Sequence, residues 1–245
     1  MIESGDYNGD GTSDVAIFRS ASGLWAVRGI TRVYFGGGAD LPVPGDYNGD
    51  QVAEIAIFRG AAGLWAVRDV TRAYFGNIGD IPSAGDYDGD GSADIAVFRE
   101  ASGLWAIQGI TRAYFGTPGD WPVPGEFAGS GTKEIAIFRP STGLWAIRNL
   151  KRIYFGRNGD WPIPGDYDGD STWGAGIFRP YSGLWALHNL TRIYYGCCTD
   201  WPRPGDYNGD STDDPCIFRP AAGLWAAKDL TRAYYGSSGD VPVTR

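Results

Sequence analysis

Residues 5–44 read GDYNGDGTSDVAIFRSASGLWAVRGITRVYFGGGADLPVP, and the chain carries six copies of this pattern. The copies begin 40 residues apart, without an insertion, at Gly5, Gly45, Gly85, Gly125, Gly165 and Gly205. A fixed period of this length is typical of solenoids, propellers and linear arrays, in which each repeat forms one supersecondary unit. We therefore expect a single domain that spans residues 1–245.

Each repeat contains four short runs with the composition of β-strands. In the first repeat they cover residues 14–19, 24–28, 31–36 and 40–46. They are rich in β-branched and aromatic residues and are separated by glycine, serine and asparagine. The first run is apolar on both faces, because Val15 and Ile17 lie on one face and Ala16 and Phe18 on the other. Such a strand must be covered on both faces, so we expect small sheets stacked face to face.

Two prolines place the fourth run at a sheet edge. The N–H groups of residues i and i+2 point to the same side of a strand, so Pro42 and Pro44 remove donors from one side only. Four antiparallel strands, covered on both faces and ending in such an edge, predict an all-β, six-bladed β-propeller with four strands per blade. A linear stack of repeats is the alternative, and it would need polar caps at both ends.

The C-terminal end of the chain predicts how the propeller closes. Residues 240–243 repeat the edge-strand sequence after the sixth repeat, where no further repeat can use it. We expect this C-terminal strand to pair beside residues 14–19 and close the ring, although residues 1–4 could fill the same place. Met1 precedes a repeat that is already in register, so we also expect the chain to come from a longer secreted precursor.

The net charge of −8 does not describe a uniformly acidic surface. Of the 29 acidic residues, 19 lie in residues 5–14 and the equivalent loops, and the remainder of the chain is basic, with a balance of +10. Acidic residues that are concentrated in loops indicate a bound cation. We do not expect nucleic acid as a partner, because that would need an uninterrupted basic face with stacking aromatics. We do not expect membrane insertion either, because no apolar run approaches roughly 20 residues.

The acidic loop presents oxygen ligands at alternate positions. In the first repeat these are the side chains of Asp6, Asn8, Asp10 and Asp14 and the backbone carbonyl of Thr12. Several carboxylates on a glycine-rich loop suit Ca²⁺, which takes about 6–8 oxygen ligands in a flexible geometry. Zinc prefers histidine and cysteine, and the single histidine lies outside these loops. The alternative is that these residues only form turns.

The other five loops keep this ligand set to different degrees. The third and sixth loops are complete, with Asp86, Asp88, Asp90 and Asp94, and with Asp206, Asn208, Asp210 and Asp214. The second keeps Asp46, Asn48, Asp50 and Glu54 but has Gln51 in place of a glycine, and the fifth keeps Asp166, Asp168 and Asp170 but has Gly174 in the last position. The fourth reads Glu126, Ala128, Ser130 and Glu134. We expect the first, third and sixth loops to bind calcium firmly, the second and fifth weakly, and the fourth not at all.

These loops, the pair Phe35-Gly36 and the Pro-Gly-Asp that follows resemble FG-GAP repeats, the calcium-loop blades of integrin α-subunit propellers. Similar repeats occur in bacterial secreted proteins and in a fungal propeller lectin. The resemblance covers residues 5–243. It implies calcium in the hairpin between the first and second strands of a blade, with a structural role. It does not define a ligand, because propellers host many functions.

Tryptophans fall into two groups. Trp25 and its five equivalents sit at the centre of a strand in every repeat, which predicts a core position between blades. Trp121, Trp161 and Trp201 replace smaller apolar residues at the start of the edge strand in three successive repeats. They are candidates for stacking against a sugar ring or a peptide, and the alternative is that they fill a local gap.

The remaining polar positions predict no catalytic centre. Arg32 and its equivalents recur once per repeat, as do the aspartates that begin with Asp40, so we expect an Arg–Asp bridge in each repeat. His188 is expected at a solvated surface position, and Cys216 replaces an alanine and is expected to be buried. Cys197 and Cys198 could be free thiols or a vicinal disulfide.

The sequence predicts a protein that is not an enzyme. We expect a calcium-stabilised, non-catalytic binding module that recognises a glycan or a protein outside the cell. The alternative is a structural or spacer domain of a larger secreted enzyme or adhesin.

Overall fold

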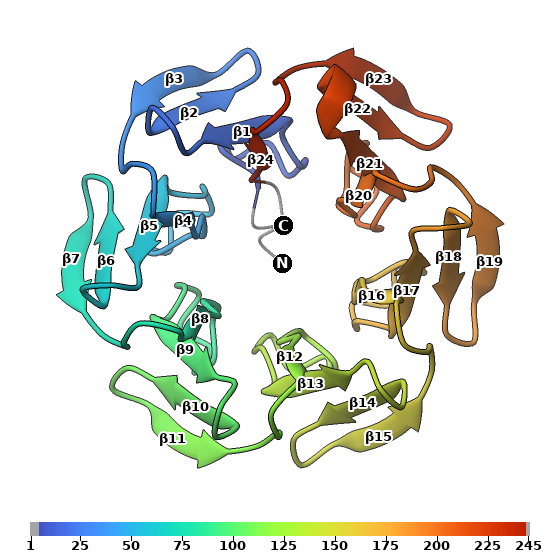
Figure 1. Ribbon diagram of the computed structural model, residues 1–245, viewed down its shortest axis with the longest axis horizontal. Helices are drawn as coiled ribbons and strands as arrows, with labels where there is room; N and C mark the ends of the chain where they lie inside the picture. The colour runs from blue at the N-terminus through green and yellow to red at the C-terminus, as the bar shows by residue number, and fades with distance from the viewer. Residues whose placement is uncertain (1–4, 244–245) are drawn as a thin grey trace. The chain divides into compact units, whose positions relative to one another are not determined.

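The computed structural model describes residues 5–243, which form an all-β, six-bladed β-propeller (Figure 1). Each blade is a four-stranded antiparallel sheet, as the repeat pattern predicts. By contacts, the described residues divide into two compact units. The first comprises residues 5–78, 91–93 and 199–243, and the second residues 79–90 and 94–198. The expectation of a single domain stays a prediction.

The edge strand of each blade is two residues long. The edge strands are β4 (Leu41–Pro42), β8 (Ile81–Pro82), β12 (Trp121–Pro122), β16 (Trp161–Pro162), β20 (Trp201–Pro202) and β24 (Val241–Pro242). The strands beside them are β1 (Ala16–Arg19), β5 (Ala56–Arg59), β9 (Ala96–Arg99), β13 (Ala136–Arg139), β17 (Gly176–Arg179) and β21 (Cys216–Arg219). The predicted position of the prolines at a sheet edge is therefore confirmed.

Two further strands complete each sheet. The third strands are β2 (Leu24–Val27), β6 (Leu64–Val67), β10 (Leu104–Ile107), β14 (Leu144–Ile147), β18 (Leu184–Leu187) and β22 (Leu224–Ala227). The fourth strands form the opposite edge and are β3 (Thr31–Tyr34), β7 (Thr71–Tyr74), β11 (Thr111–Tyr114), β15 (Lys151–Tyr154), β19 (Thr191–Tyr194) and β23 (Thr231–Tyr234). A short 3₁₀ turn, η1 (Pro220–Ala222), precedes β22. No helix in the described part of the chain is long and apolar enough to span a membrane.

The core lies between consecutive blades. In the first unit, Phe18 and Trp25 of one blade, both fully buried, share a cluster with Ile57 and Ala66 of the next. The Nε1 of Trp25 donates a hydrogen bond to the carbonyl of Phe35 at 3.0 Å, so its polar atom is satisfied. The core position predicted for the repeated tryptophan is therefore confirmed. Truncating one to alanine would cost roughly 3–5 kcal/mol.

The C-terminal strand completes the first blade. β24 pairs antiparallel with β1, with Val241 opposite Phe18 and Pro242 opposite Ile17 (Figure 1). The hydroxyl of Tyr7 also donates to the carbonyl of Val243 at 2.6 Å. This confirms the predicted closing strand. The alternative, residues 1–4, lies outside the described residues.

The Arg–Asp bridges exist, but the predicted arginine was wrong. The Nε of Arg59 donates to the carboxylate of Asp40 at 2.7 Å. Arg32 is exposed, on the strand at the opposite edge of its sheet. The reason is register, because the pairing of Leu41 with Phe58 places the residue before Leu41 beside Arg59. The bridges are Arg19–Asp240, Arg59–Asp40, Arg99–Asp80, Arg139–Asp120, Arg179–Asp160 and Arg219–Asp200.

None of the three described cysteines forms a disulfide. Cys216 is buried, as predicted, and burial raises the pKa of its thiol to about 12. Cys197 and Cys198 are exposed thiols without a disulfide. His188 is half-buried, with its ring 5.1 Å from that of Phe155, so it is less solvated than predicted.

Candidate metal centres

Five of the acidic loops connect an edge strand to the next strand of the same blade, and the first leads into β1, whose edge strand β24 comes from the C-terminal end. In the second repeat the loop follows β4 and leads into β5, and Gly45 forms a β-bridge with Glu54 at its base. The N–H of Glu54 donates to the carbonyl of Gly45 at 2.8 Å. The loop is therefore the hairpin between the first and second strands of the blade. This is the position at which the FG-GAP resemblance expects calcium.

The first aspartate shapes the loop. Asp46 is buried, and its two carboxylate oxygens accept hydrogen bonds from the N–H groups of Gly49 at 2.7 Å and Gln51 at 2.8 Å. Such bonds from an Asp side chain to the following backbone stabilise a tight turn. Gln51 has φ 71°, the left-handed conformation that glycine adopts at this position in the first and third loops. A residue with a side chain is strained there by roughly 1–2 kcal/mol, and Ser171 and Ser211 adopt the same conformation in the fifth and sixth loops.

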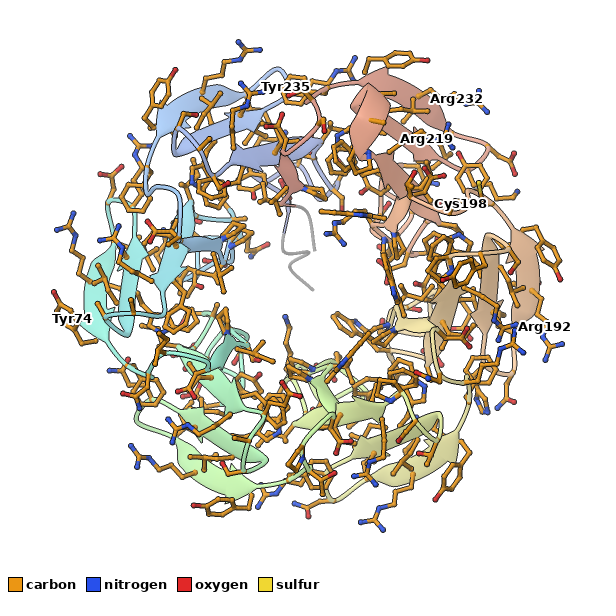
Figure 2. The ribbon with its side chains drawn as sticks, viewed as in Figure 1. Tyr74, Arg192, Cys198, Arg219, Arg232 and Tyr235 are labelled. Atoms are coloured by element: carbon orange, nitrogen blue, oxygen red, sulfur yellow. The ribbon has the colours of Figure 1, made fainter. Side chains whose placement is uncertain are left out.

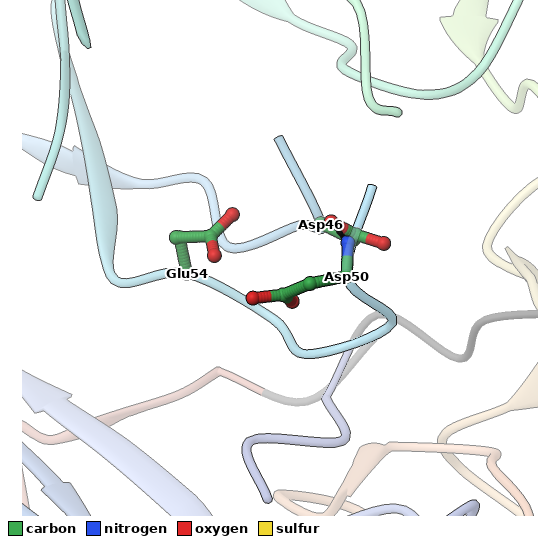
Figure 3. Close-up of side chains that lie close together, drawn as sticks. All are labelled: Asp46, Asp50 and Glu54. Atoms are coloured by element: carbon green, nitrogen blue, oxygen red, sulfur yellow. Dashed lines mark hydrogen bonds between the residues drawn. The ribbon is translucent and has the colours of Figure 1, made fainter. Parts of the chain in front are cut away.

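Three of the described loops bring three carboxylates together. In each, one oxygen from every member lies within 4.8 Å of the others, and the groups are Asp46, Asp50 and Glu54; Asp86, Asp88 and Asp94; and Asp166, Asp168 and Asp170. Figure 3 shows the first group on its single loop. All of these donors are oxygens, the set that a hard cation such as Ca²⁺ prefers. The residues therefore fit the expected ion.

Among the described loops, the carboxylate groups do not follow the predicted ranking, because the second and fifth loops form a group and the first and sixth do not. The fifth loop forms a carboxylate group although Gly174 occupies its last position. In the first, second and sixth loops an asparagine takes the place of a middle carboxylate, and its amide donates to its neighbours. Asn8 Nδ2 donates to Asp14 at 3.4 Å, and Asn208 Nδ2 donates to Asp210 at 3.0 Å. The ranking of calcium affinities stays a prediction.

Three loops hold an aspartate with a raised pKa. The pKa of Asp14, Asp94 and Asp214 is raised to about 6 in each case. Removal from water is the main cause, and nearby carboxylates add to it, Asp10 and Asp6 in the first loop. A hydrogen bond from the N–H of a tyrosine opposes this rise. The loops thus hold more negative charge than their surroundings stabilise, and a bound cation would neutralise it.

The fourth loop satisfies its own polar groups. Glu126 is buried and accepts a hydrogen bond from the N–H of Ser130 at 2.6 Å. The hydroxyl of Ser130 is 2.8 Å from that of Thr132 and bonds to Glu134 at 3.4 Å. Two carboxylates and these hydroxyls offer a cation fewer charged ligands than the other loops do. The expectation that the fourth loop does not bind calcium stays a prediction.

The loops also join consecutive repeats. The carbonyl of Asp6 accepts a hydrogen bond from the N–H of Ala53 in the next loop at 2.7 Å, and the carbonyl of Asp86 accepts one from Lys133 at 2.6 Å. The glycine that begins a repeat permits this approach. A Cβ at Gly125 would lie 2.2 Å from the ring of Trp173 in the following loop. A ligand that orders one loop would therefore also stabilise its contact with the next blade.

The candidate ligand-binding tryptophans lie on edge strands. Trp121 is 40% exposed, and Trp161 and Trp201 are half-buried. Each stands opposite a buried phenylalanine, with ring centroids 6.3–6.4 Å apart. Part of each indole therefore packs on the blade, and the rest is accessible.

Sequence reasoning missed Arg203, which stands close to one of these tryptophans. Its guanidinium lies 5.8 Å from the ring centroid of Trp201 and donates to the carbonyl of Pro202 at 2.8 Å, while its Nε has no hydrogen-bond partner. Burial lowers its pKa to about 10, and none of the described carboxylates pairs with it. The one sequence signal is a departure from the repeat, because other repeats have an apolar residue, such as Val43 or Val123, at this position.

A scan against protein-family models finds no match to this chain. A search of the curated proteins finds no match either. The FG-GAP resemblance therefore rests on the motifs alone.

Proposed function

We propose that this protein is a calcium-stabilised, non-catalytic binding module that recognises a glycan or a protein outside the cell. The observation that carries the calcium part is the grouping of three carboxylates within 4.8 Å in equivalent hairpins. Their oxygens would supply the charged ligands, and neighbouring carbonyls and water would complete the shell. Extracellular calcium is abundant enough to fill sites with dissociation constants of about 10⁻⁴–10⁻³ M.

Two features of the described residues support a binding role. Trp201 offers a partly accessible ring, and Arg203 beside it offers a cation without a carboxylate partner. In the second unit, a pocket of about 250 Å³ has an apolar wall that includes Leu184, with Tyr154 and Arg192 also in its lining. Aromatic faces and charged donors around a hollow are typical of sites for small polar ligands. The alternative, a spacer domain of a larger secreted protein, requires none of these features.

Binding to a glycan array, and to immobilised extracellular proteins, tests this proposal in calcium-containing buffer. We expect a bound ligand whose signal falls at least about tenfold in one of the variants Trp121→Ala, Trp161→Ala or Trp201→Ala. The matched control is Leu41→Ala, because Leu41 has the same place on its edge strand and is 48% exposed. No ligand for the wild-type protein would favour the spacer domain.

A further inference from the structure

Most of the unpaired positive charge lies in one part of each blade. We call residues 28–34, 68–74, 108–114, 148–154, 188–194 and 228–234 the outer-edge hairpins, because each contains a turn and the fourth strand of its sheet. They contain eleven arginines and lysines and two acidic residues. Six other arginines are neutralised by the buried aspartates of the Arg–Asp bridges. The acidic loops hold 19 acidic residues at a separate place in each blade.

Every outer-edge hairpin presents the same pair of exposed side chains. The tyrosines Tyr34, Tyr74, Tyr114, Tyr154, Tyr194 and Tyr234 are 72–77% exposed. An exposed arginine precedes each by two residues, at Arg32, Arg72, Arg112, Arg152, Arg192 and Arg232. Residues i and i+2 of a strand share a face and lie about 6–7 Å apart along it. Figure 2 shows Tyr74 and Arg192 extending away from the strands that carry them.

These side chains take no part in the core of the described blades. The two acidic residues of the outer-edge hairpins pair with their own neighbours, Asp69 with Arg68 and Asp229 with Lys228. Among the described residues, no ion pair involves the arginines of the fourth strands. A large aromatic side chain left in solvent at the same position of every repeat adds nothing to the core, and such recurrent exposure marks an interaction surface.

The chemistry of the pair indicates its partner. A guanidinium binds carboxylate or sulfate groups through two parallel hydrogen bonds, which an ammonium group cannot do. A tyrosine ring offers an apolar face and a polar tip at low entropic cost. We infer that the outer-edge hairpins bind an acidic polysaccharide, a sugar chain that carries carboxylate or sulfate groups. This inference rests on the proposed binding function and assigns a ligand class to the sheet edge opposite Trp121, Trp161 and Trp201.

Repetition would strengthen the interaction. Each of the two units contains three outer-edge hairpins, and a polymer that contacts one is held at high effective concentration near the others. A nucleic acid is the less favoured partner. Proteins that bind single strands hold the phosphate backbone in a basic groove and stack bases on aromatic rings along it, whereas these tyrosines are more than 70% exposed.

The test measures binding of the full-length protein, with calcium present, to immobilised heparin and polygalacturonate. Neutral dextran of matched length and single-stranded DNA are the comparison polymers. We expect binding to both acidic polysaccharides that weakens as salt rises, and no binding to dextran. The double variant Arg152→Gln/Arg192→Gln should lose affinity about three- to tenfold. Lys133→Gln/Arg157→Gln changes the net charge equally outside the hairpins, and it should bind like the wild type.

A second variant tests the tyrosines. Tyr154→Ser/Tyr194→Ser removes the aromatic faces and keeps the charge, so it should lower affinity without changing the salt dependence. Equal losses of affinity in Arg152→Gln/Arg192→Gln and in the control Lys133→Gln/Arg157→Gln would show that only net charge matters, and this would overturn the inference. Binding to single-stranded DNA as tight as binding to heparin would overturn it too. Binding to neutral glycans but not to acidic polymers would refute this inference and leave the proposed function standing. Thermal unfolding of each variant confirms that it is folded.

Discussion

Within one acidic loop, the carboxylates have different tasks. Asp46 is buried and holds the backbone of its loop through hydrogen bonds from Gly49 and Gln51. Asp50 and Glu54 are more exposed and share the space beside it. These hydrogen bonds hold the shape of the loop, whereas a bound ion would balance its charge. Substitution of Asp50 or Glu54 should therefore weaken cation binding and leave the turn in place.

Asp50→Ala should lower stability much more in calcium than in EDTA. The side chain accepts a hydrogen bond from Val52 at 2.9 Å, and it is a member of the three-carboxylate group. A hundredfold loss of calcium affinity at saturating ion would cost up to about 2.7 kcal/mol. Ser130→Ala is the control. Ser130 occupies the position of Asp50 in the fourth loop, and its substitution also removes a short hydrogen bond. Equal shifts of the melting temperature in calcium, for the two variants, would argue that the loops are turns without a metal.

The raised pKa values predict an unusual pH dependence for the chelated protein. Asp14, Asp94 and Asp214 have a folded pKa of about 6, above the ordinary 3.8. Between these values the folded state binds more protons than the unfolded state, so its stability falls as pH rises. In EDTA the melting temperature should therefore be higher at pH 5 than at pH 7.

Calcium should reverse this trend. Deprotonated carboxylates bind the ion better, so the gap between the melting temperatures in calcium and in EDTA should widen from pH 5 to pH 7. Differential scanning calorimetry across this range measures both curves. A gap that stays constant would contradict the assignment of these aspartates to a cation site.

At the scale of the strand, the Arg–Asp bridge joins the edge strand to its neighbour. Asp120 is fully buried and accepts hydrogen bonds from Arg139 Nε at 2.6 Å and from the N–H of Thr117 at 2.8 Å. It therefore fixes both the turn before β12 and the end of β13. The edge strand itself is two residues long, so this bridge supplies much of its attachment.

Asp120→Asn should destabilise the fold by about 2–4 kcal/mol. The substitution leaves a guanidinium that has lost its counter-charge, and breaking one partner of a buried pair is costly. Asp69→Asn is the matched control, because Asp69 pairs with Arg68 in solvent, where such pairs contribute about 0–1 kcal/mol. Urea unfolding monitored by tryptophan fluorescence measures both. A loss below 1 kcal/mol for Asp120→Asn would show that the bridge does not hold the edge strand.

The sequence predicted the strands correctly, but it did not predict which side chains form ion pairs. Pro42 and Pro44 located the sheet edge, and the repeat of the edge sequence at residues 240–243 located the closing strand. The bridging arginine was misassigned because Arg19 and Arg32 recur with the same period. Periodicity cannot distinguish two such residues, whereas antiparallel register does.

The candidate site was predictable to a similar degree. Spacing placed the oxygen ligands on the hairpins that the structure shows. Which carboxylates converge depends on side-chain rotamers, which spacing does not encode, and so the fifth loop forms a group that its Gly174 did not suggest. Arg203 was overlooked because a single substitution in one repeat carries no periodic signal.

At the scale of the whole molecule, charge is sorted by position in the repeat. Each blade carries an acidic loop, a neutralised Arg–Asp bridge and, at the opposite edge of the sheet, a basic hairpin with an exposed tyrosine. The net charge of −8 hides this separation. A cation in the loops would leave the basic hairpins as the dominant feature of the surface. Calcium would then favour both the fold and the approach of an acidic ligand.

The melting temperature of the unmodified protein in EDTA and in calcium tests the central claim most directly. The protein is freed of metal, its calcium content is measured by elemental analysis before and after, and magnesium at the same concentration is the control. A ligand that binds only the folded state stabilises it by mass action, so we predict that EDTA lowers the melting temperature by about 5–15 °C and that calcium, but not magnesium, restores it. An unchanged melting temperature together with no bound calcium would contradict the account.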